Sequence, residues 1–380
     1  MQTIHKILIF INIYYIQMAD PIVFKHYSKK LTKANISRLA SSNASYYPYY
    51  TSAILSSIYQ ITPLTSDRVN VAIISLGGGY KESDLTNYWN LLGLATRPNV
   101  YSVSVDGATN SPGSGDDIEN DLDIQTIGGI VPNSNIYVYF APNSLQGFQD
   151  AFSAAANNKT HPFNVISCSW GAPEAAFTSG QLKTFNNLLA SIAAKGITIC
   201  VASGDNGSSD GLSGLNVDFP ASSPNVLACG GTSLNCPSQV YSTKTTSERS
   251  WSGSGGGFSS YFAKPSYQNN VPLLSKSSKR AIPDVSADAD PNTGVIVALD
   301  GQYYVVGGTS LSAPIWAGYL AGQNIGRRFV TPILYKNLQS GFHDIVQGSN
   351  GAYSARQGFD LVTGWGTPSG YTLTRLIKKN

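Results

Sequence analysis

Two acidic residues and one serine stand in patterns that suit acid–base and nucleophilic chemistry. Glu119 and Asp123 are four residues apart, and in a helix this spacing places both carboxyl groups on one face. Ser310 lies in the segment 307–314, GGTSLSAP, and the apolar pattern after it predicts a helix over 311–325 with the serine at its N-terminus. A serine hydroxyl is a poor nucleophile at its own pKa and needs a neighbouring base. In many enzymes that base is a histidine oriented by a carboxylate.

Histidine does not supply the base in this chain. The motif G-T-S-x-S-A-P around Ser310 resembles the nucleophile segment of subtilisin-like peptidases, which place their histidine in an H-G-T setting. The chain has four histidines, and none has that setting: His5, His26, His161 and His343. Two interpretations follow: the chain has lost its activity, or the base is a carboxyl group. The pair Glu119 and Asp123 favours the second.

A third segment completes the pattern. Residues 202–207 (ASGDNG) form a small-residue turn directly after an apolar run. With these residues in place, the chain resembles the sedolisin family of serine-carboxyl peptidases, and its kumamolisin-like branch most. The resemblance runs from about residue 47 to about residue 371. Any one segment is a weak signal, whereas the ordered set is specific, and it includes 72–80 (AIISLGGGY), 165–171 (VISCSWG), 218–224 (DFPASSP) and 255–259 (GGGFS).

The resemblance implies a role for each catalytic residue. Ser310 is the nucleophile, Glu119 the general base, and Asp123 the residue that orients and polarises Glu119. Asp205 donates a hydrogen bond to the oxyanion, which only a protonated carboxyl group can do. A carboxylate base with a pKa of about 4.3 still works in acid, where histidine is protonated. The resemblance therefore predicts an endopeptidase with an acidic optimum, and it leaves a tripeptidyl-peptidase or a non-catalytic binding protein as alternatives.

Three further residues resemble the family's substrate cleft. Trp170 and Gly171 match residues beside it, and Asp218 matches an acidic residue of the pocket for P1, the residue that contributes the carbonyl of the scissile bond. A carboxylate there favours basic or polar P1 side chains, while a surface-loop aspartate is the alternative. In the kumamolisin-like branch a glutamate on the first strand extends the carboxylate network. Ser75 takes that position here, which leaves the depth of the acid optimum open.

The C-terminal part resembles the family's calcium site. Hard oxygen ligands suit Ca²⁺, and the motifs are 342–345 (FHDI) and 358–364 (GFDLVTG). The resemblance implies one structural ion, held by the carboxylates of Asp344 and Asp360 and the backbone carbonyls of Ile345, Arg356 and Gly358. Arg356 replaces the usual glycine, which a backbone ligand tolerates if its φ and ψ suit a residue with a side chain. The ion is expected to tie the last loop to the core.

Apolar strand patterns alternate with helical ones through the first half of the chain. The expected strands are 69–76, 100–105, 135–140, 163–169 and 197–202, and the expected helices are 84–94, 118–130, 145–156 and 179–194. Such alternation predicts a parallel sheet covered by helices on both faces. With the resemblance, it predicts a subtilisin-like three-layer α/β fold. Sites in such sheets gather at the carboxyl ends of strands, where 169–171 and 203–205 fall. The region 207–286 is expected to be rich in loops, with strand fragments.

Composition limits the partners. Of 380 residues, 42% are hydrophobic, enough for a full core, and only 12% are charged, against about 25% in typical domains. Few charges limit self-repulsion when carboxylates are protonated, which suits an acidic medium. The net charge of +3 without basic runs argues against nucleic acid binding. The expected partner is a polypeptide substrate, and the expected state is a monomer.

The four cysteines do not identify the redox compartment. Cys168 and Cys200 end apolar, strand-like runs, which indicates buried thiols. Cys229 and Cys236 are close enough in sequence to pair, but free thiols are the favoured interpretation.

Residues 1–46 are predicted to be an N-terminal arm, and residues 47–380 one peptidase domain. The apolar run within 1–17 is too short to span a membrane. It suits the hydrophobic core of a signal peptide, but the cleavage site that would follow is poor. A start of translation at Met18 is the rival interpretation. Secretion or an acidic compartment is therefore favoured over other locations, without a convincing signal peptide. The arm is too short for the large prodomain usual in sedolisins. Folding without one, a separate prodomain-like inhibitor and a truncated sequence remain open.

Overall fold

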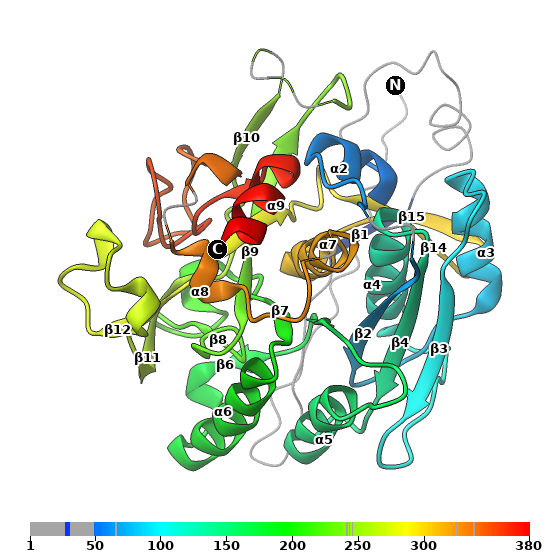
Figure 1. Cartoon of the computed structure of the whole chain (residues 1–380), viewed down its shortest axis with the longest axis horizontal. Helices are drawn as coiled ribbons and strands as arrows, with labels where there is room; N and C mark the ends of the chain where they lie inside the picture. Colours follow the sequence, from blue (N-terminus) through cyan, green and yellow to red (C-terminus); the bar gives the residue numbers. More distant parts are fainter. Residues whose placement is uncertain are drawn as a thin grey trace, which may run out of the picture.

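The computed structural model describes residues 27–30, 49–64, 67–240, 242, 244, 246–323, 325–336 and 339–380. A mainly parallel sheet lies between two layers of helices (Figure 1), and the predicted subtilisin-like three-layer fold is confirmed. Most of the predicted N-terminal arm, including the signal-like segment 1–17, lies outside the described residues. No helix in the described ranges is both long and apolar enough to cross a membrane.

The central sheet has eight strands in the order β10-β9-β7-β5-β2-β4-β3, with β13 also paired to β9. Their bounds are β2 Val69–Ser75, β3 Asn99–Ser104, β4 Ser134–Phe140, β5 Val165–Cys168, β7 Thr198–Ala202, β9 Leu227–Asn235, β10 Ser247–Ser250 and β13 Val285–Asp288. All the pairs are parallel except β10 with β9. Strands buried on both faces are apolar without interruption, and β2 sends Val71 and Ile73 into one core but Ala72 and Ile74 into the other.

Helices cover both faces of this sheet. One face packs against α5 (Leu145–Ala156) and α6 (Ser179–Ala194), at the bottom of Figure 1. The other packs against α2 (Ser52–Ile58), α3 (Glu82–Leu91), α4 (Asp117–Ile130), α7 (Thr309–Gly322) and α9 (Gly370–Lys379).

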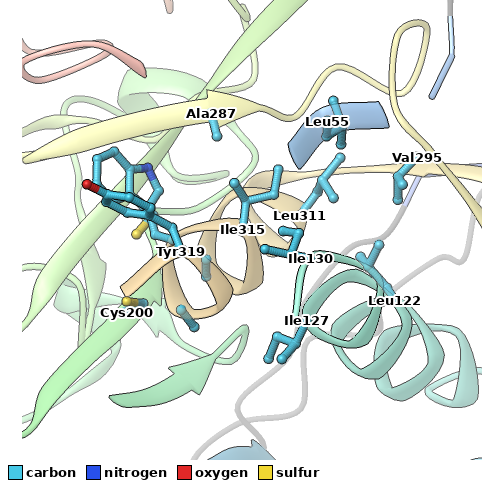
Figure 2. Packing of buried hydrophobic residues seen from close by; sticks show 14 of the residues in the cluster. Leu55, Leu122, Ile127, Ile130, Cys200, Ala287, Val295, Leu311, Ile315 and Tyr319 are labelled. Carbon is cyan, nitrogen blue, oxygen red and sulfur yellow. The ribbon is translucent and has the colours of Figure 1, made fainter. Parts of the chain in front are cut away.

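Two buried helices, α4 and α7, lie against each other in the second layer. Every residue of both is buried, as expected for helices in the middle of a large domain. Figure 2 shows Leu311 of α7 and Ile130 of α4 in the space between them. Gly318 permits this close approach, because a Cβ there would lie 3.2 Å from Cγ2 of Ile130. These two helices carry the predicted base and nucleophile.

Smaller elements complete the fold. A three-stranded antiparallel sheet consists of β1 (Tyr27–Lys30), β15 (Gln302–Gly307) and β14 (Val295–Leu299), and β15 leads directly into α7. The short strands are β6 Ala172–Pro173, β8 Asp218–Phe219, β11 Gly257–Ala263, β12 Lys279–Ile282, β16 Phe342–His343 and β17 Thr367–Pro368. The remaining helices are α8 Thr331–Leu334 and the 3-10 turns Glu174–Ala176, Gly207–Ser209, Ser266–Gln268, Pro272–Leu274 and Gln339–Gly341.

The region 207–286 departs most from expectation. Loops do dominate it, but it also supplies β9, a nine-residue strand inside the central sheet. The sequence of β9, LACGGTSLN, hides this strand because Gly230 and Gly231 interrupt its apolar pattern. Packing explains Gly231: a Cβ there would lie 2.6 Å from Cβ of Ala289 and 2.9 Å from the ring of Trp251. The four cysteines are all buried and free, as expected.

Candidate active site

Helix α4 presents Glu119 and Asp123 on one buried face, and each side chain is about 1% exposed. The Asp117 carboxylate anchors the first turn of α4, accepting hydrogen bonds from the backbone N–H of Gly79, Gly113 and Ser114. An acidic residue in the first turn also interacts favourably with the helix dipole. No sequence pattern predicted this role for Asp117. It ties the helix of the predicted base to the glycine turn after β2.

Helix α7 places Ser310 in its first turn, where the helix geometry leaves the backbone N–H groups without intrahelical acceptors. Pro314 lies four residues after Ser310 and has no N–H, so the Ser310 carbonyl lacks its usual helical donor. The hydroxyl of Ser169, directly after β5, lies 3.3 Å from this carbonyl oxygen. The same hydroxyl is 2.8 Å from Oδ1 of Asp123. Ser169 therefore connects the two helices that hold the predicted catalytic groups.

Burial raises the pKa of both Glu119 and Asp123 well above the ordinary range. For Glu119 the charge of Asp123 raises the pKa further, while hydrogen bonds with the side chains of Ser169 and Ser310 lower it. Two buried carboxyl groups this close cannot both be charged without a large energetic cost. The arrangement therefore favours a protonated carboxyl group in this pair, and the Ser310 side chain lies near enough to Glu119 to lower its pKa.

Asp205 follows β7 and lies under the start of α7. Its Oδ1 accepts hydrogen bonds from the backbone N–H of Thr309 at 2.7 Å and from the Thr309 hydroxyl at 2.8 Å. Its Oδ2 has no hydrogen-bond partner within the described part of the chain. Gly308, with φ of 111°, leaves room for this oxygen, because a Cβ there would lie 2.5 Å from it. Burial raises the pKa of Asp205 to about 6, so the carboxyl group is neutral in acid.

Trp170, Gly171 and Asp218 come together beside these groups. Strands β6 and β8 pair antiparallel, with Ala172 opposite Phe219 and Pro173 opposite Asp218. A Cβ on Gly171 would lie 2.1 Å from Oδ1 of Asp218. Asp218 is about 3% exposed, so the surface-loop alternative is wrong. Burial raises its pKa well above the ordinary range, and the charges of Asp210 and Asp205 raise it further.

Ser75 ends β2 opposite Phe140 of β4. Its hydroxyl donates a hydrogen bond to the carbonyl of Gly77 at 3.0 Å. The side chain thus closes the turn after its own strand.

The C-terminal loops bring together the residues of the predicted calcium site. Oδ2 of Asp344 accepts a hydrogen bond from the N–H of Gly358 at 2.8 Å, and Oδ2 of Asp360 accepts one from the N–H of Arg356 at 3.1 Å. Ile345 is buried next to Asp344. Arg356 is not among the residues with positive φ, so the replacement of glycine causes no backbone strain.

The donor set of these loops is compatible with a hard cation. It consists of carboxylate and carbonyl oxygens, the ligands that Ca²⁺ prefers. Only two acidic side chains take part, and the described residues contain no cluster of three or more histidine, cysteine, aspartate or glutamate side chains suited to a metal. Backbone carbonyls would therefore have to supply most of the coordination.

Comparison with known proteins places the chain in a family. Residues 100–323 match the model described as the subtilase family. Kumamolisin of Bacillus sp. (strain MN-32) is 42% identical over 329 residues, which cover 81% of this chain and 59% of kumamolisin. Human tripeptidyl-peptidase 1 is 31% identical over 329 residues, which cover 76% of this chain and 56% of that protein. The chain thus spans less than two thirds of the length of these relatives.

A solved structure covers nearly the whole described chain. It is that of Pseudomonas sedolisin, a serine-carboxyl proteinase complexed with two molecules of pseudo-iodotyrostatin. It matches with a TM-score of 0.77 and 30% identity, covering 88% of this chain and 99% of that one. The chain therefore belongs to the sedolisin family of subtilisin-like proteins, as a kumamolisin-like member.

Proposed function

We propose that this protein is an acid-acting serine-carboxyl endopeptidase that cleaves polypeptides through an acyl-enzyme on Ser310. The observation that carries the proposal is that the Ser310 side chain lies near enough to Glu119, a buried carboxyl group, to lower its pKa, where other serine peptidases use histidine. Kumamolisin and sedolisin, its relatives, support the same chemistry. One chain supplies Ser310, Glu119, Asp123 and Asp205, so a monomer is sufficient.

The first half-reaction begins with attack by Oγ of Ser310 on the carbonyl carbon of the scissile bond. Glu119 takes the hydroxyl proton, and Asp123, held by Ser169, stabilises the protonated pair. The oxygen of the tetrahedral intermediate accepts hydrogen bonds from the protonated Asp205 and the backbone N–H of Ser310. Preorganised donors of this kind contribute roughly 3–4 kcal/mol each to the transition state. Glu119 then gives its proton to the leaving amine, and the C–N bond breaks.

The second half-reaction repeats these roles with water. Glu119 takes a proton from a water molecule, whose oxygen attacks the acyl carbon. The intermediate collapses, the proton returns to Oγ of Ser310, and the new carboxylic acid leaves. Asp205 must be protonated in both halves, and its pKa of about 6 confines that condition to acid.

Two accessory roles belong to the same proposal. Asp218 favours basic or polar P1 side chains, and Trp170 and Gly171 line the cleft beside it. One calcium ion would be held by Asp344 and Asp360 with the backbone carbonyls of Ile345, Arg356 and Gly358, and it would fasten the last loops to the core. Regulation by a separate prodomain-like inhibitor remains a prediction.

The test compares the wild-type protein with Ser310→Ala and Glu119→Gln on a denatured protein substrate from pH 3 to pH 7. We expect hydrolysis in acid by the wild type and none by either variant, with Tm nearly unchanged for Ser310→Ala. An acylating inhibitor should modify Ser310, as seen by mass spectrometry. The lengths of the products separate an endopeptidase from a tripeptidyl-peptidase, the alternative that the human relative suggests. Wild-type activity that increases through neutral pH would contradict the carboxylate base.

A further inference from the structure

Helix α9, in red in Figure 1, and the loop 326–329 carry basic side chains on the surface. In α9, Tyr371, Arg375 and Lys378 are exposed, and their spacing of four and three residues places them on one side of the helix. Lys379 is exposed beside them. In the loop, one arginine is exposed and the next is half-buried. We call the five cations of these two segments the basic face: Arg327, Arg328, Arg375, Lys378 and Lys379.

Contacts between distant segments bring the loop and the helix together. The guanidinium group of Arg328 donates a hydrogen bond to the carbonyl oxygen of Ile377 at 3.2 Å, so the loop lies at the end of α9. The Arg328 carbonyl accepts a hydrogen bond from the Thr198 hydroxyl at 2.9 Å. Thr198 is the first residue of β7, whereas Asp205 follows the other end of that strand. A partner bound at this loop would therefore lie at the opposite end of the parallel sheet from the catalytic groups.

Acidic side chains are missing from the three segments that meet here. Residues 175–204, 301–343 and 361–380 contain eight lysine and arginine residues but no aspartate or glutamate, although the chain has 22 acidic residues and a net charge of only +3. No cation of the basic face has an ion pair with a carboxylate among the described residues. Lys81, an exposed lysine elsewhere, does have such a partner in Asp300. The positive charge of the chain is therefore concentrated in these three segments.

Helix capping accounts for only part of the basic face. Cations near the C-terminus of a helix interact favourably with its dipole, which suits Lys378 and Lys379 in the last turn of α9 and Arg328 at the Ile377 carbonyl. Arg375 lies in the middle of α9, and Arg327 lies outside any helix. Like charges that gather without such a reason repel one another. An anionic partner would relieve this repulsion.

The chemistry of the basic face narrows the choice of partner. Lysine and arginine stay charged in acid, whereas carboxylates become protonated there. A partner that stays anionic in the acidic medium of the proposed activity therefore carries phosphate or sulfate esters. Tyr371, which is 61% exposed, and half-buried Leu376 lie on α9 among the cations. Aromatic and aliphatic side chains beside basic ones are typical of surfaces that rest in the headgroup region of a bilayer.

We propose that the basic face docks the protein onto a membrane surface that contains anionic phospholipids. The phosphate groups would pair with the five cations, and Tyr371 would lie between the headgroups. The attachment is peripheral, and it leaves the candidate active site at the far end of the sheet open to substrate. This inference goes beyond the proposed peptidase function and takes only the acidic medium from it.

The experiment measures co-sedimentation of the full chain with vesicles at pH 5. One kind of vesicle has equal parts of phosphatidylglycerol and phosphatidylcholine, and the other has phosphatidylcholine alone. We expect binding to the anionic vesicles only, and loss of this binding at high salt, because salt screens exposed charges. Lys378→Gln with Lys379→Gln should weaken binding about fivefold for each cation removed, or about 30-fold in all. Both side chains are exposed, so the fold should be kept.

A matched control removes the same charge from elsewhere on the surface. Lys244→Gln with Lys276→Gln changes two exposed lysines, one between β9 and β10 and one before β12, and should leave binding nearly unchanged. Tyr371→Ser should weaken binding severalfold without changing its salt dependence, because the tyrosine supplies contact rather than charge.

Three results would overturn the proposal. They are equal binding to both kinds of vesicle, equal losses in the two double variants, and capture of the chain by sulfated polysaccharide beads without binding to anionic vesicles. Hydrolysis is not part of the readout, so the two proposals can fail separately. Vesicle binding by a chain that cleaves no protein substrate would refute the peptidase function and keep the docking face. Cleavage without vesicle binding would do the reverse.

Discussion

Two groups of buried carboxyl residues in this protein differ in what surrounds them. Asp284 has a fully buried ion pair with Arg280 at 2.6 Å, and it also accepts hydrogen bonds from the Tyr335 hydroxyl and the N–H of Ala228. In the candidate site, Glu119 and Asp205 meet hydroxyl groups, a backbone N–H and each other's charge. No ion pair within the described ranges involves Asp205.

The different partners suit different roles: those of Asp284 suit a structural carboxylate, and those of Asp205 suit a carboxyl group that exchanges a proton. A cation and several donors keep a buried carboxylate charged, and the same contacts join distant segments such as Ala228 and Tyr335 to Asp284. Burial without a cation raises the pKa instead, as it does for Asp205. The protein therefore places the same residue type in two different settings, and the proposed function gives each setting its own role. Four predictions test this comparison.

The largest effect is expected at the buried ion pair of Arg280 and Asp284. Arg280→Met leaves Asp284 buried without its cation, which should lower the free energy of unfolding by about 3–5 kcal/mol. Chemical denaturation measures this loss. Arg280→Met with Asp284→Leu should recover a large part of it, because no unpaired charge remains. Activity per folded molecule should stay near that of the wild type in the double variant; a loss there as large as that for Ser310→Ala would mean that the two groups are not independent.

At Asp205 we expect a large loss of activity and a small loss of stability, the reverse of the result expected for Arg280 and Asp284. Asp205→Asn keeps an oxygen for Thr309 and an N–H donor for the oxyanion, but it loses the neutral hydroxyl donor and its titration. We expect kcat to fall about 10²–10³-fold, with little loss of stability. The residual activity should extend further toward neutral pH than that of the wild type. A pH profile of kcat beside a melting curve checks both expectations. A large fall in Tm with kcat preserved would reverse the comparison.

Much of this arrangement was predictable, and the reasons differ by residue. Glu119, Asp123, Asp205 and Ser310 were expected as the catalytic set because the local motifs that contain them resemble those of sedolisins, and the structure places them near one another. Ser169 was missed as a connecting residue because its contacts join α4 and α7, which are far apart in the chain. Ser169 does fall at the carboxyl end of a predicted strand, which was a usable signal. Strand β9 was missed because its glycines serve contacts with Ala289 and Trp251 that no local pattern encodes.

The pH dependence of stability sharpens the comparison further. Asp205 has an ordinary pKa near 3.9 in the unfolded chain and about 6 in the folded one. The folded state therefore binds more protons between these values, and stability decreases as pH increases through the window. A shift of this size corresponds to about 3 kcal/mol. Between pH 4 and pH 7 the wild type should therefore lose about 2 kcal/mol more than Asp205→Asn, because the unfolded-state aspartate is already half ionised at pH 4.

His343 changes stability in the other direction, which is why the difference between the two proteins is the quantity to measure. Burial lowers the pKa of His343 to about 4, so its contribution is lost as pH falls from about 6.5. This contribution is the same in the wild type and in Asp205→Asn and cancels in the subtraction. Denaturant titrations at pH 4, 5, 6 and 7 give the curves. Parallel curves of unfolding free energy against pH for the two proteins would show that burial does not raise the pKa of Asp205.

The smallest of the four effects is expected from calcium. It tests whether Asp344 and Asp360 are satisfied structural carboxylates, like Asp284, or carboxylates that need a further partner. Asp360 already accepts hydrogen bonds from the N–H groups of Arg356, Val362 and Thr363, like a satisfied structural carboxylate. Among the described residues, Asp344 accepts one hydrogen bond, from the N–H of Gly358. If both bind Ca²⁺, the ion stabilises the native state by about 2.7 kcal/mol at a concentration 100 times its Kd. Chelation should then lower Tm, and Asp344→Asn should abolish the response to Ca²⁺ with little loss of stability in the chelated protein. Asp360→Asn should also destabilise the chelated protein, because its backbone donors lose a charged acceptor. An unchanged Tm after chelation would assign both carboxylates to loop structure alone.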